Sequence, residues 1–140
     1  LTATTHLYDG VAETLRRLHA GAHVSVLTNK PQRPTDAILA SLGVAPFVHA
    51  AIGGDSSYGR KPAPDALRAL IDRAGATVEE TLMVGDSWVD VATAVAAGVD
   101  ACLVTYGFGF AAVDAEHRAR ARWSIDAIDS LLPLMSAHQR

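Results

Sequence analysis

The sequence lacks the features that mark a disulfide-stabilised or membrane-spanning protein. Its one cysteine, Cys102, has no partner for a disulfide within the chain and lies in an apolar run, so we expect a buried thiol. No apolar run approaches the roughly 18–20 residues that a membrane-spanning helix requires. No charged start followed by an apolar stretch resembles a secretory leader, and we therefore expect a cytoplasmic location.

An excess of positive charge is also missing. Lysine and arginine total 12 and aspartate and glutamate total 15, which gives a formal net charge of −3 at pH 7. Binding to a nucleic-acid backbone requires a basic surface, and the short basic cluster at residues 117–122 is interpreted as a solvated face. We expect neither a nucleic-acid partner nor a membrane partner.

The chain does have enough apolar residues to build one core. Hydrophobic residues make up 49% of its 140 positions, which suits a single domain. Five short runs are apolar at successive positions, a pattern typical of strands that are buried on both faces. These runs are residues 23–29, 47–54, 81–86, 101–106 and 123–126.

Segments with the helical spacing of apolar residues alternate with these runs. They cover residues 11–20, 34–42, 64–74, 89–97 and 125–137, and a glycine follows each of the first four as a stop signal. Residues 77–80 form a capping-box pattern, and residues 107–112 are predicted to be a flexible loop. The alternation predicts an α/β fold, with an open, doubly wound parallel sheet and helices on both faces.

Polar side chains with useful chemistry stand near the ends of the predicted strands. Thr28 lies at the end of the first run, and Lys61 lies in a loop before a helix. Asp86 ends the third run, and Asp90 follows four residues later. Ligands of such sheets bind at the carboxyl ends of the strands. A hydroxyl, an ammonium and two carboxylates suit a phosphate and a divalent cation such as Mg²⁺. Taken singly, each residue also suits a turn, a solvated charge or a helix cap.

Three motifs in this order resemble the core of a haloacid dehalogenase (HAD) superfamily hydrolase of the phosphoglycolate phosphatase type. They are "VLTNK", "GRKPAPD" and "MVGDSWVD". The resemblance implies a small phosphorylated metabolite as substrate, Mg²⁺ as cofactor and a Rossmann-like core. It also implies that Thr28, Asn29 and Lys61 bind phosphate and that Lys61 is catalytic. Asp86 and Asp90 would form the metal site, with Asp86 as a ligand of Mg²⁺ and Asp90 supporting the groups around the ion.

The family's first motif, Asp-x-Asp, has no counterpart in the chain. One alignment places "HLYDGV" on it, so that Leu7 replaces the nucleophile and Asp9 is the second, acid–base aspartate. The other alignment makes residues 8–11 the turn by which the chain returns from a cap domain, and Asp9 then only begins a helix. We favour the second, which predicts that residues 1–140 are a single truncated core domain without a cap.

Loss of the first motif has consequences for both structure and function. The missing strand would be central, between the strands that end at Thr28 and Asp86. Those strands could close directly, residues 1–7 could supply a makeshift strand, or a second copy could donate one in a homodimer formed by strand exchange. We favour residues 1–7. Two functions remain open, a phosphatase impaired by the missing nucleophile, or an inactive remnant that binds phosphate, metal or protein.

Overall fold

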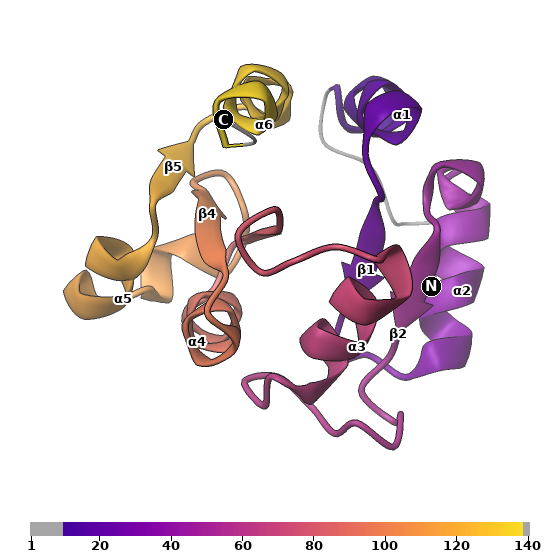
Figure 1. The fold of residues 1–140 in the computed structure, drawn as a ribbon, viewed down its shortest axis with the longest axis horizontal. Helices are drawn as coiled ribbons and strands as arrows, with labels where there is room; N and C mark the ends of the chain where they lie inside the picture. Colours follow the sequence, from indigo (N-terminus) through magenta and orange to yellow (C-terminus); the bar gives the residue numbers. More distant parts are fainter. Residues whose placement is uncertain (1–9, 139–140) are drawn as a thin grey trace.

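The computed structural model describes residues 10–138 and shows an α/β fold (Figure 1). The strands are β1 (Ser25–Leu27), β2 (Ala50–Ile52), β3 (Leu82–Gly85), β4 (Asp100–Val104) and β5 (Trp123–Ile125). The α-helices are α1 (Val11–Gly21), α2 (Gln32–Ser41), α3 (Asp65–Ala74), α4 (Trp88–Ala97), α5 (Ala115–Arg120) and α6 (Leu131–His138). Three short 3₁₀ helices are η2 (Ala45–Phe47), η3 (Phe110–Ala112) and η4 (Ile128–Ser130).

The strands are parallel, as predicted, but they form two sheets. β1 pairs with β2 in one sheet, and the other has the order β3-β4-β5. The suggestion that the strands ending at Thr28 and Asp86 close directly on each other is therefore wrong, because β1 and β3 do not pair. The suggested strand at residues 1–7 lies outside the described residues.

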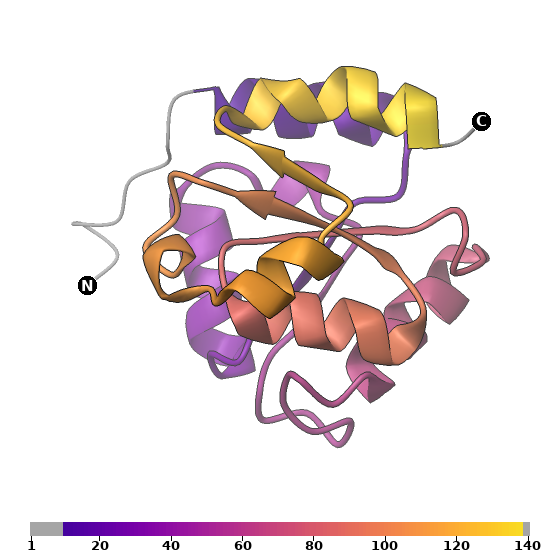
Figure 2. The same ribbon diagram turned by 90° about the vertical axis from the view of Figure 1, so that its left-hand side faces the viewer.

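Helices cover both faces of the strands (Figures 1 and 2). α1 and α6 lie side by side on one face, while α3 and α4 cover the other. α4 packs on β3 and β4, and α3 contacts both β1 and α4. No helix of residues 10–138 is both long and apolar enough to cross a membrane.

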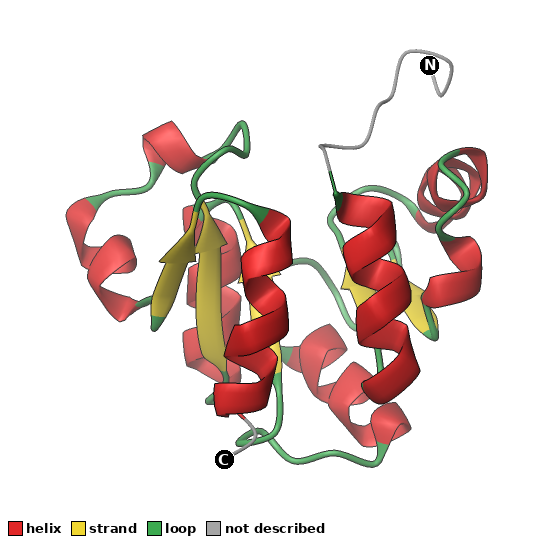
Figure 3. Ribbon diagram, turned by 90° about the horizontal axis from the view of Figure 1, so that it is seen from above, coloured by secondary structure: helices red, strands yellow, loops and turns green. Residues whose placement is uncertain are grey.

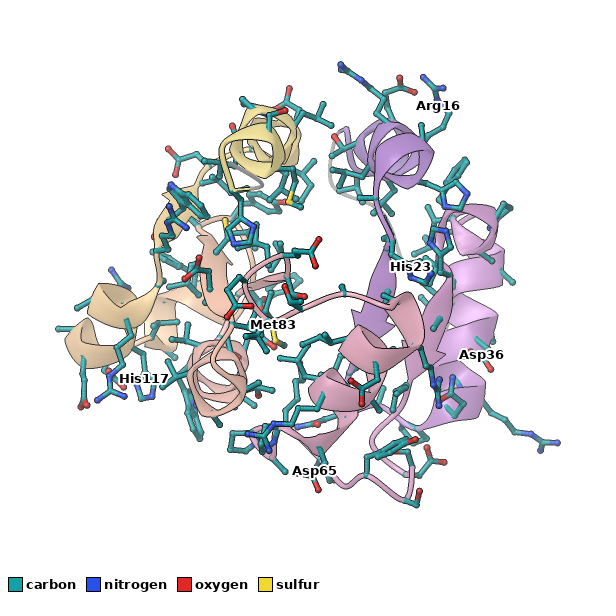
Figure 4. The ribbon with its side chains drawn as sticks, viewed as in Figure 1. Arg16, His23, Asp36, Asp65, Met83 and His117 are labelled. Carbon is teal, nitrogen blue, oxygen red and sulfur yellow. The ribbon has the colours of Figure 1, made fainter. Side chains whose placement is uncertain are left out.

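β4 forms the centre of the core because its side chains alternate between the two helix layers. Leu103, fully buried, packs with Val91 of α4 and with Met83, which points into the interior in Figure 4. On the other face, Cys102 packs with Leu131 of α6. Burial raises the pKa of the Cys102 thiol to about 11, which confirms a buried cysteine and leaves the thiol protonated at neutral pH.

Three local details differ from the sequence-based expectations. The last helix begins at Leu131, since β5 and η4 occupy the preceding residues; this puts Pro133 in the first turn, where proline is tolerated. The sequence pattern did not predict α5. This helix begins after its N-cap, Asp114, whose side chain accepts a hydrogen bond from the His117 backbone N–H at 2.8 Å. Only half of the predicted capping box forms: Glu80 Oε1 accepts hydrogen bonds from the Thr77 backbone N–H and hydroxyl, while the Glu80 N–H donates to the Thr77 carbonyl, and the segment lies in the connection between α3 and β3.

Asp100, at the start of β4, ties the end of α6 to the sheet. Its Oδ2 accepts hydrogen bonds from Arg122 Nη1 at 2.8 Å and from His138 Nε2 at 3.1 Å. The hydrogen-bonded Arg122 guanidinium, with a smaller contribution from His138, holds the pKa of Asp100 below its ordinary value of 3.8. The Asp100 side chain is 41% exposed, so solvent screens these interactions.

This cluster predicts an acid-sensitive contribution to stability. Because the pKa of Asp100 is lower in the folded state, its contribution is present above pH 3.8 and is lost as the pH falls through the folded-state pKa. Asp100→Asn should therefore lose less unfolding free energy than wild type between about pH 5 and pH 2, by under about 1 kcal/mol. Urea unfolding across that range measures the difference. Arg122→Gln should likewise reduce the loss of unfolding free energy between about pH 5 and pH 2. An equal loss of unfolding free energy in all three proteins over that range would contradict the assignment.

Candidate active site

Lys61 and Asp90 form an ion pair at the carboxyl ends of the strands. Lys61 lies in the loop between β2 and α3, and Asp90 lies in the first turn of α4, after β3. The Lys61 Nζ–Asp90 Oδ1 distance is 2.5 Å, and the side chains are only 13% and 9% exposed. The pair therefore joins a loop of one sheet to a helix of the other, and the two sheets share one rim.

Asn29, just after β1, holds the backbone of Lys61 in place. The Lys61 backbone N–H donates to Asn29 Oδ1 at 2.8 Å, and Asn29 Nδ2 donates to the Lys61 carbonyl at 3.1 Å. Both polar atoms of the Asn29 side chain are thus engaged with one residue. In this structure Asn29 positions Lys61, while its direct contact with phosphate stays a prediction.

Asp90 accepts hydrogen bonds on both carboxylate oxygens. Besides Lys61 at Oδ1, its Oδ2 accepts bonds from the Asp86 and Ser87 backbone N–H groups at 3.1 and 3.3 Å and from Ser87 Oγ at 3.1 Å. Ser87 is the N-cap of α4 and forms a capping box with Asp90. The alternative interpretations of Asp86 as the helix cap and of Asp90 as an exposed first-turn acid are therefore wrong.

Thr28 presents its hydroxyl at the same rim. Its Oγ1 accepts a hydrogen bond from the Lys30 backbone N–H at 3.1 Å, which fixes the turn after β1. Gly54, after β2, packs closely against this turn: a Cβ at Gly54 would lie 2.2 Å from the Asn29 carbonyl oxygen. The Gly54 backbone N–H also donates to the Lys30 carbonyl at 2.7 Å. The end of β2 therefore supports the turn that carries Thr28.

The loop after β4 also belongs to this site, which the sequence pattern did not predict. A Cβ at Gly107 would lie 2.2 Å from Asp86 Cβ, and the Gly109 backbone N–H donates to Asp86 Oδ2 at 3.2 Å. The loop predicted to be flexible is thus packed against Asp86, and the signal was the glycine pair in "GFGF". Phe108, between the glycines, is 96% exposed.

Comparison with known proteins assigns this arrangement to a family. Residues 1–98 match the family model described as haloacid dehalogenase-like hydrolase. The chain belongs to this family. The resemblance inferred from the three motifs is confirmed, and so is the fold class.

HAD-like relatives of known sequence and structure agree with this assignment. The chain is 45% identical to the phosphoglycolate phosphatase of Rhodospirillum rubrum, over 76% of this chain and 44% of that protein. It is 39% identical to the phosphoglycolate phosphatase of Pseudomonas putida KT2440, over 92% of this chain and 47% of that protein. A crystal structure of a predicted phosphoglycolate phosphatase from Haemophilus somnus 129PT has 32% identity and a TM-score of 0.85, over 92% of this chain and 57% of that one. The chain thus spans about half the length of these curated relatives.

The described residues do not complete a magnesium site. Mg²⁺ takes six oxygen ligands in near-octahedral geometry, several of them from water. Both oxygens of Asp90 are already bonded to protein donors, and Asp86 uses one oxygen for Gly109. Between residues 10 and 138, no group of three or more His, Cys, Asp or Glu side chains is placed to hold a metal ion. Asp9, the other acid suggested by the sequence, lies outside the described residues.

The buried ion pair should show strong energetic coupling. Lys61→Met or Asp90→Asn alone should cost about 3–5 kcal/mol of unfolding free energy, because each leaves a charge or polar partner buried without its mate. The double variant should cost less than the sum, with a coupling energy of about 2 kcal/mol in a urea-unfolding double-mutant cycle.

Glu116 and Arg120 supply the matched surface pair for this cycle. Their contact is 3.0 Å long, and the side chains are 52% and 71% exposed for Arg120 and Glu116. The same cycle there should give about 0.3–0.5 kcal/mol. Equal coupling at the two sites would show that the Lys61–Asp90 pair is not the buried link described here.

Gly85, the last residue of β3, gives a second test of how closely this site is packed. A Cβ at Gly85 would lie 2.2 Å from Asp90 Oδ2, whereas nothing lies within 4 Å of a Cβ at Gly21. Gly85→Ala should cost about 1–3 kcal/mol in urea unfolding and shift the Lys61 amide resonance. Gly21→Ala should leave stability unchanged or raise it by up to about 1 kcal/mol. The packing account fails if both alanines have the same effect.

Proposed function

We propose that the chain is the phosphate-binding core of a phosphatase that acts on small phosphate monoesters of the phosphoglycolate kind. The observation that carries the proposal is the Lys61–Asp90 pair at the rim, beside the turn that carries the Thr28 hydroxyl. The curated relatives described as phosphoglycolate phosphatases favour the same substrate class. The substrate is therefore a small phosphorylated metabolite.

Each residue of the rim has a role that follows from its contacts. Lys61 is the cation that attracts a phosphoryl oxygen. Asn29 positions its backbone, and Asp90 positions its ammonium group. The Thr28 hydroxyl, whose oxygen already accepts the Lys30 N–H, has its hydrogen left to donate to phosphate. Such a preset arrangement binds an anion without having to reorganise first.

Asp86 is the residue we assign to Mg²⁺. The loop from Gly107 to Gly109 holds its carboxylate in place, and Oδ1 accepts no hydrogen bond within the described part of the chain. A bound Mg²⁺ would neutralise charge on the phosphoryl group. The remaining ligands would come from water, from phosphate and from groups outside residues 10–138. Asp90 would support Asp86 by accepting its backbone N–H.

A second candidate function is a binding module without turnover. The observation that favours it is that Asp86 and Asp90, the acids at the rim, are both engaged by protein donors. Asp90 is bonded on both oxygens and Asp86 is assigned to Mg²⁺, so neither is left as a nucleophile beside Lys61 and Thr28, and covalent catalysis would need another group. Under this proposal the chain holds phosphate or a phosphorylated ligand but does not cleave it.

Titration with inorganic phosphate tests the part that both functions share. Saturable shifts of the Thr28–Lys61 rim amides in ¹H–¹⁵N NMR spectra are expected. Lys61→Met should weaken binding by about 10–100-fold, since a hydrogen bond to a charged group contributes about 1.5–3 kcal/mol. Lys30 is the chain's only other lysine and is exposed, so Lys30→Met is the matched control and should change affinity less than threefold. Equal effects of the two variants would reject the site.

Turnover then separates the two functions. Phosphate release from phosphoglycolate with Mg²⁺ is compared between wild type and Asp86→Ala purified in parallel, which measures contaminating phosphatases. Release well above that background identifies a phosphatase. Release equal to it, together with phosphate binding, identifies the binding module.

A further inference from the structure

Two aromatic side chains follow Asp86 closely at the rim, and the anion site described above uses neither of them. Phe108 is 96% exposed and Trp88 is 44% exposed. Among residues 10–138, Phe108 is the most exposed of the large apolar side chains. An aromatic ring left in water gives up the stabilisation that burial would provide. Such a ring is informative where its backbone is held in place, because it is then available for contact with a ligand.

The backbone around Phe108 is a hydrogen-bonded turn. The Phe110 backbone N–H donates to the Gly107 carbonyl at 3.2 Å, which places Phe108 at the second position of the turn. The Arg118 guanidinium lies 4.3 Å from the centroid of the Phe110 ring and donates to the Phe110 carbonyl at 3.2 Å. Figure 3 shows this loop extending past the end of β4, before η3. Phe108 is therefore presented to solvent on a turn that is held on both sides.

Trp88 is held by a different set of contacts. It is the first residue of α4, directly after the N-cap Ser87. The centroid of its ring lies 5.7 Å from that of His117, the residue labelled on α5 in Figure 4. His117 is in turn tied to Asp114, whose Oδ2 lies 2.7 Å from His117 Nδ1. The indole ring thus rests on α5, while part of its surface stays open to solvent.

The backbone segments that carry the two rings touch each other. A Cβ at Gly109 would lie 3.1 Å from Ser87 Cβ and 3.0 Å from the Asp86 carbonyl oxygen. Gly109 directly follows Phe108, and Ser87 directly precedes Trp88. The point of contact is therefore one residue away from each ring.

This contact lies beside the anion site. Trp88 and Asp90 share the first turn of α4, and the Asp90 carboxylate is bonded to Lys61 Nζ. A ligand whose phosphate is held by Lys61 has its organic group next to the phosphate at this rim. The two rings offer that group apolar surface, which suits a flat or apolar group better than a small charged one.

We propose that Trp88 and Phe108 form an apolar subsite for the organic group of the phosphorylated ligand, and that the site prefers ligands in which this group is aromatic or otherwise apolar. The inference rests on the function proposed above and extends its substrate class beyond the glycolyl group. A glycolyl group is small and carries a carboxylate, so it would cover little of the two rings. A larger apolar group would remove their surface from water.

Phenylphosphonate and methylphosphonate test the subsite as a matched pair of ligands. They carry the same phosphonate group, neither has an ester bond to cleave, and the comparison is made at a pH where both are dianions. Titration of the full 140-residue chain, followed by ¹H–¹⁵N NMR, gives both dissociation constants. Phenylphosphonate should bind about tenfold more tightly, and it should shift the Trp88 indole N–H resonance more than methylphosphonate does.

Two variants and a control locate the preference. Phe108→Ala and Trp88→Leu should each weaken phenylphosphonate binding by about threefold to tenfold and change methylphosphonate binding by less than about twofold. Because Phe108 is 96% exposed, its replacement should leave the thermal unfolding midpoint unchanged. Val95 is 43% exposed but lies in the last turn of α4, away from the rim. Val95→Ala is therefore the matched control and should change neither affinity.

The contrary outcomes separate this inference from the proposed function. Equal affinities for the two phosphonates, with both bound at the rim, would overturn the apolar subsite and leave the anion site intact. A preference for phenylphosphonate that persists in both Phe108→Ala and Trp88→Leu would also overturn it, because the apolar contact would then lie elsewhere. Failure of both ligands to bind would reject the anion site itself, and the subsite with it.

Discussion

The attraction between the Lys61 ammonium and the Asp90 carboxylate is the interaction on which the rim depends. β1 and β3 do not pair, so within residues 10–138 no backbone ladder connects the two sheets at this place. The ion pair, extended through Asn29 to the end of β1, makes one rim of the two sheets. Because the pair is largely shielded from water, removing either member leaves a charge or polar group without its partner. The pair therefore serves the structure before any ligand binds.

Glycine supplies the second constraint, because the backbone must approach these carboxylates closely. Gly85 leaves room for the Asp90 carboxylate, and Gly107 leaves room for Asp86. Larger residues would push either acid out of place. The result is a rim whose Asn29 and Asp90 side chains are each held by two or more hydrogen bonds, and the groups they hold are preset as anion binding and phosphoryl transfer require.

Much of this could be predicted from the sequence, and the failures have physical causes. Apolar runs and glycine stops located the strands and most helices, and strand ends located Thr28, Lys61, Asp86 and Asp90. Pairing is a long-range property, so the runs could not show that the strands divide into two sheets. Neither could composition show that "GFGF" packs against Asp86, because the reason is a close approach of two segments far apart in the chain. Asn29 was predicted as a phosphate ligand, but its engagement with Lys61 depends on the same kind of long-range contact.

The family assignment and the contacts at the rim together indicate which chemical groups of the chain can bind a ligand. It belongs to the HAD-like hydrolases, it spans about half of its curated relatives, and its described acids at the rim are already bonded. The central claim is that Lys61 and Thr28 form an anion site. A crystal structure grown with tungstate, a phosphate mimic with strong anomalous scattering, tests it most directly. We predict an anomalous peak within hydrogen-bond distance of Lys61 Nζ and Thr28 Oγ1, whereas tungstate bound only elsewhere on the molecule would contradict the account.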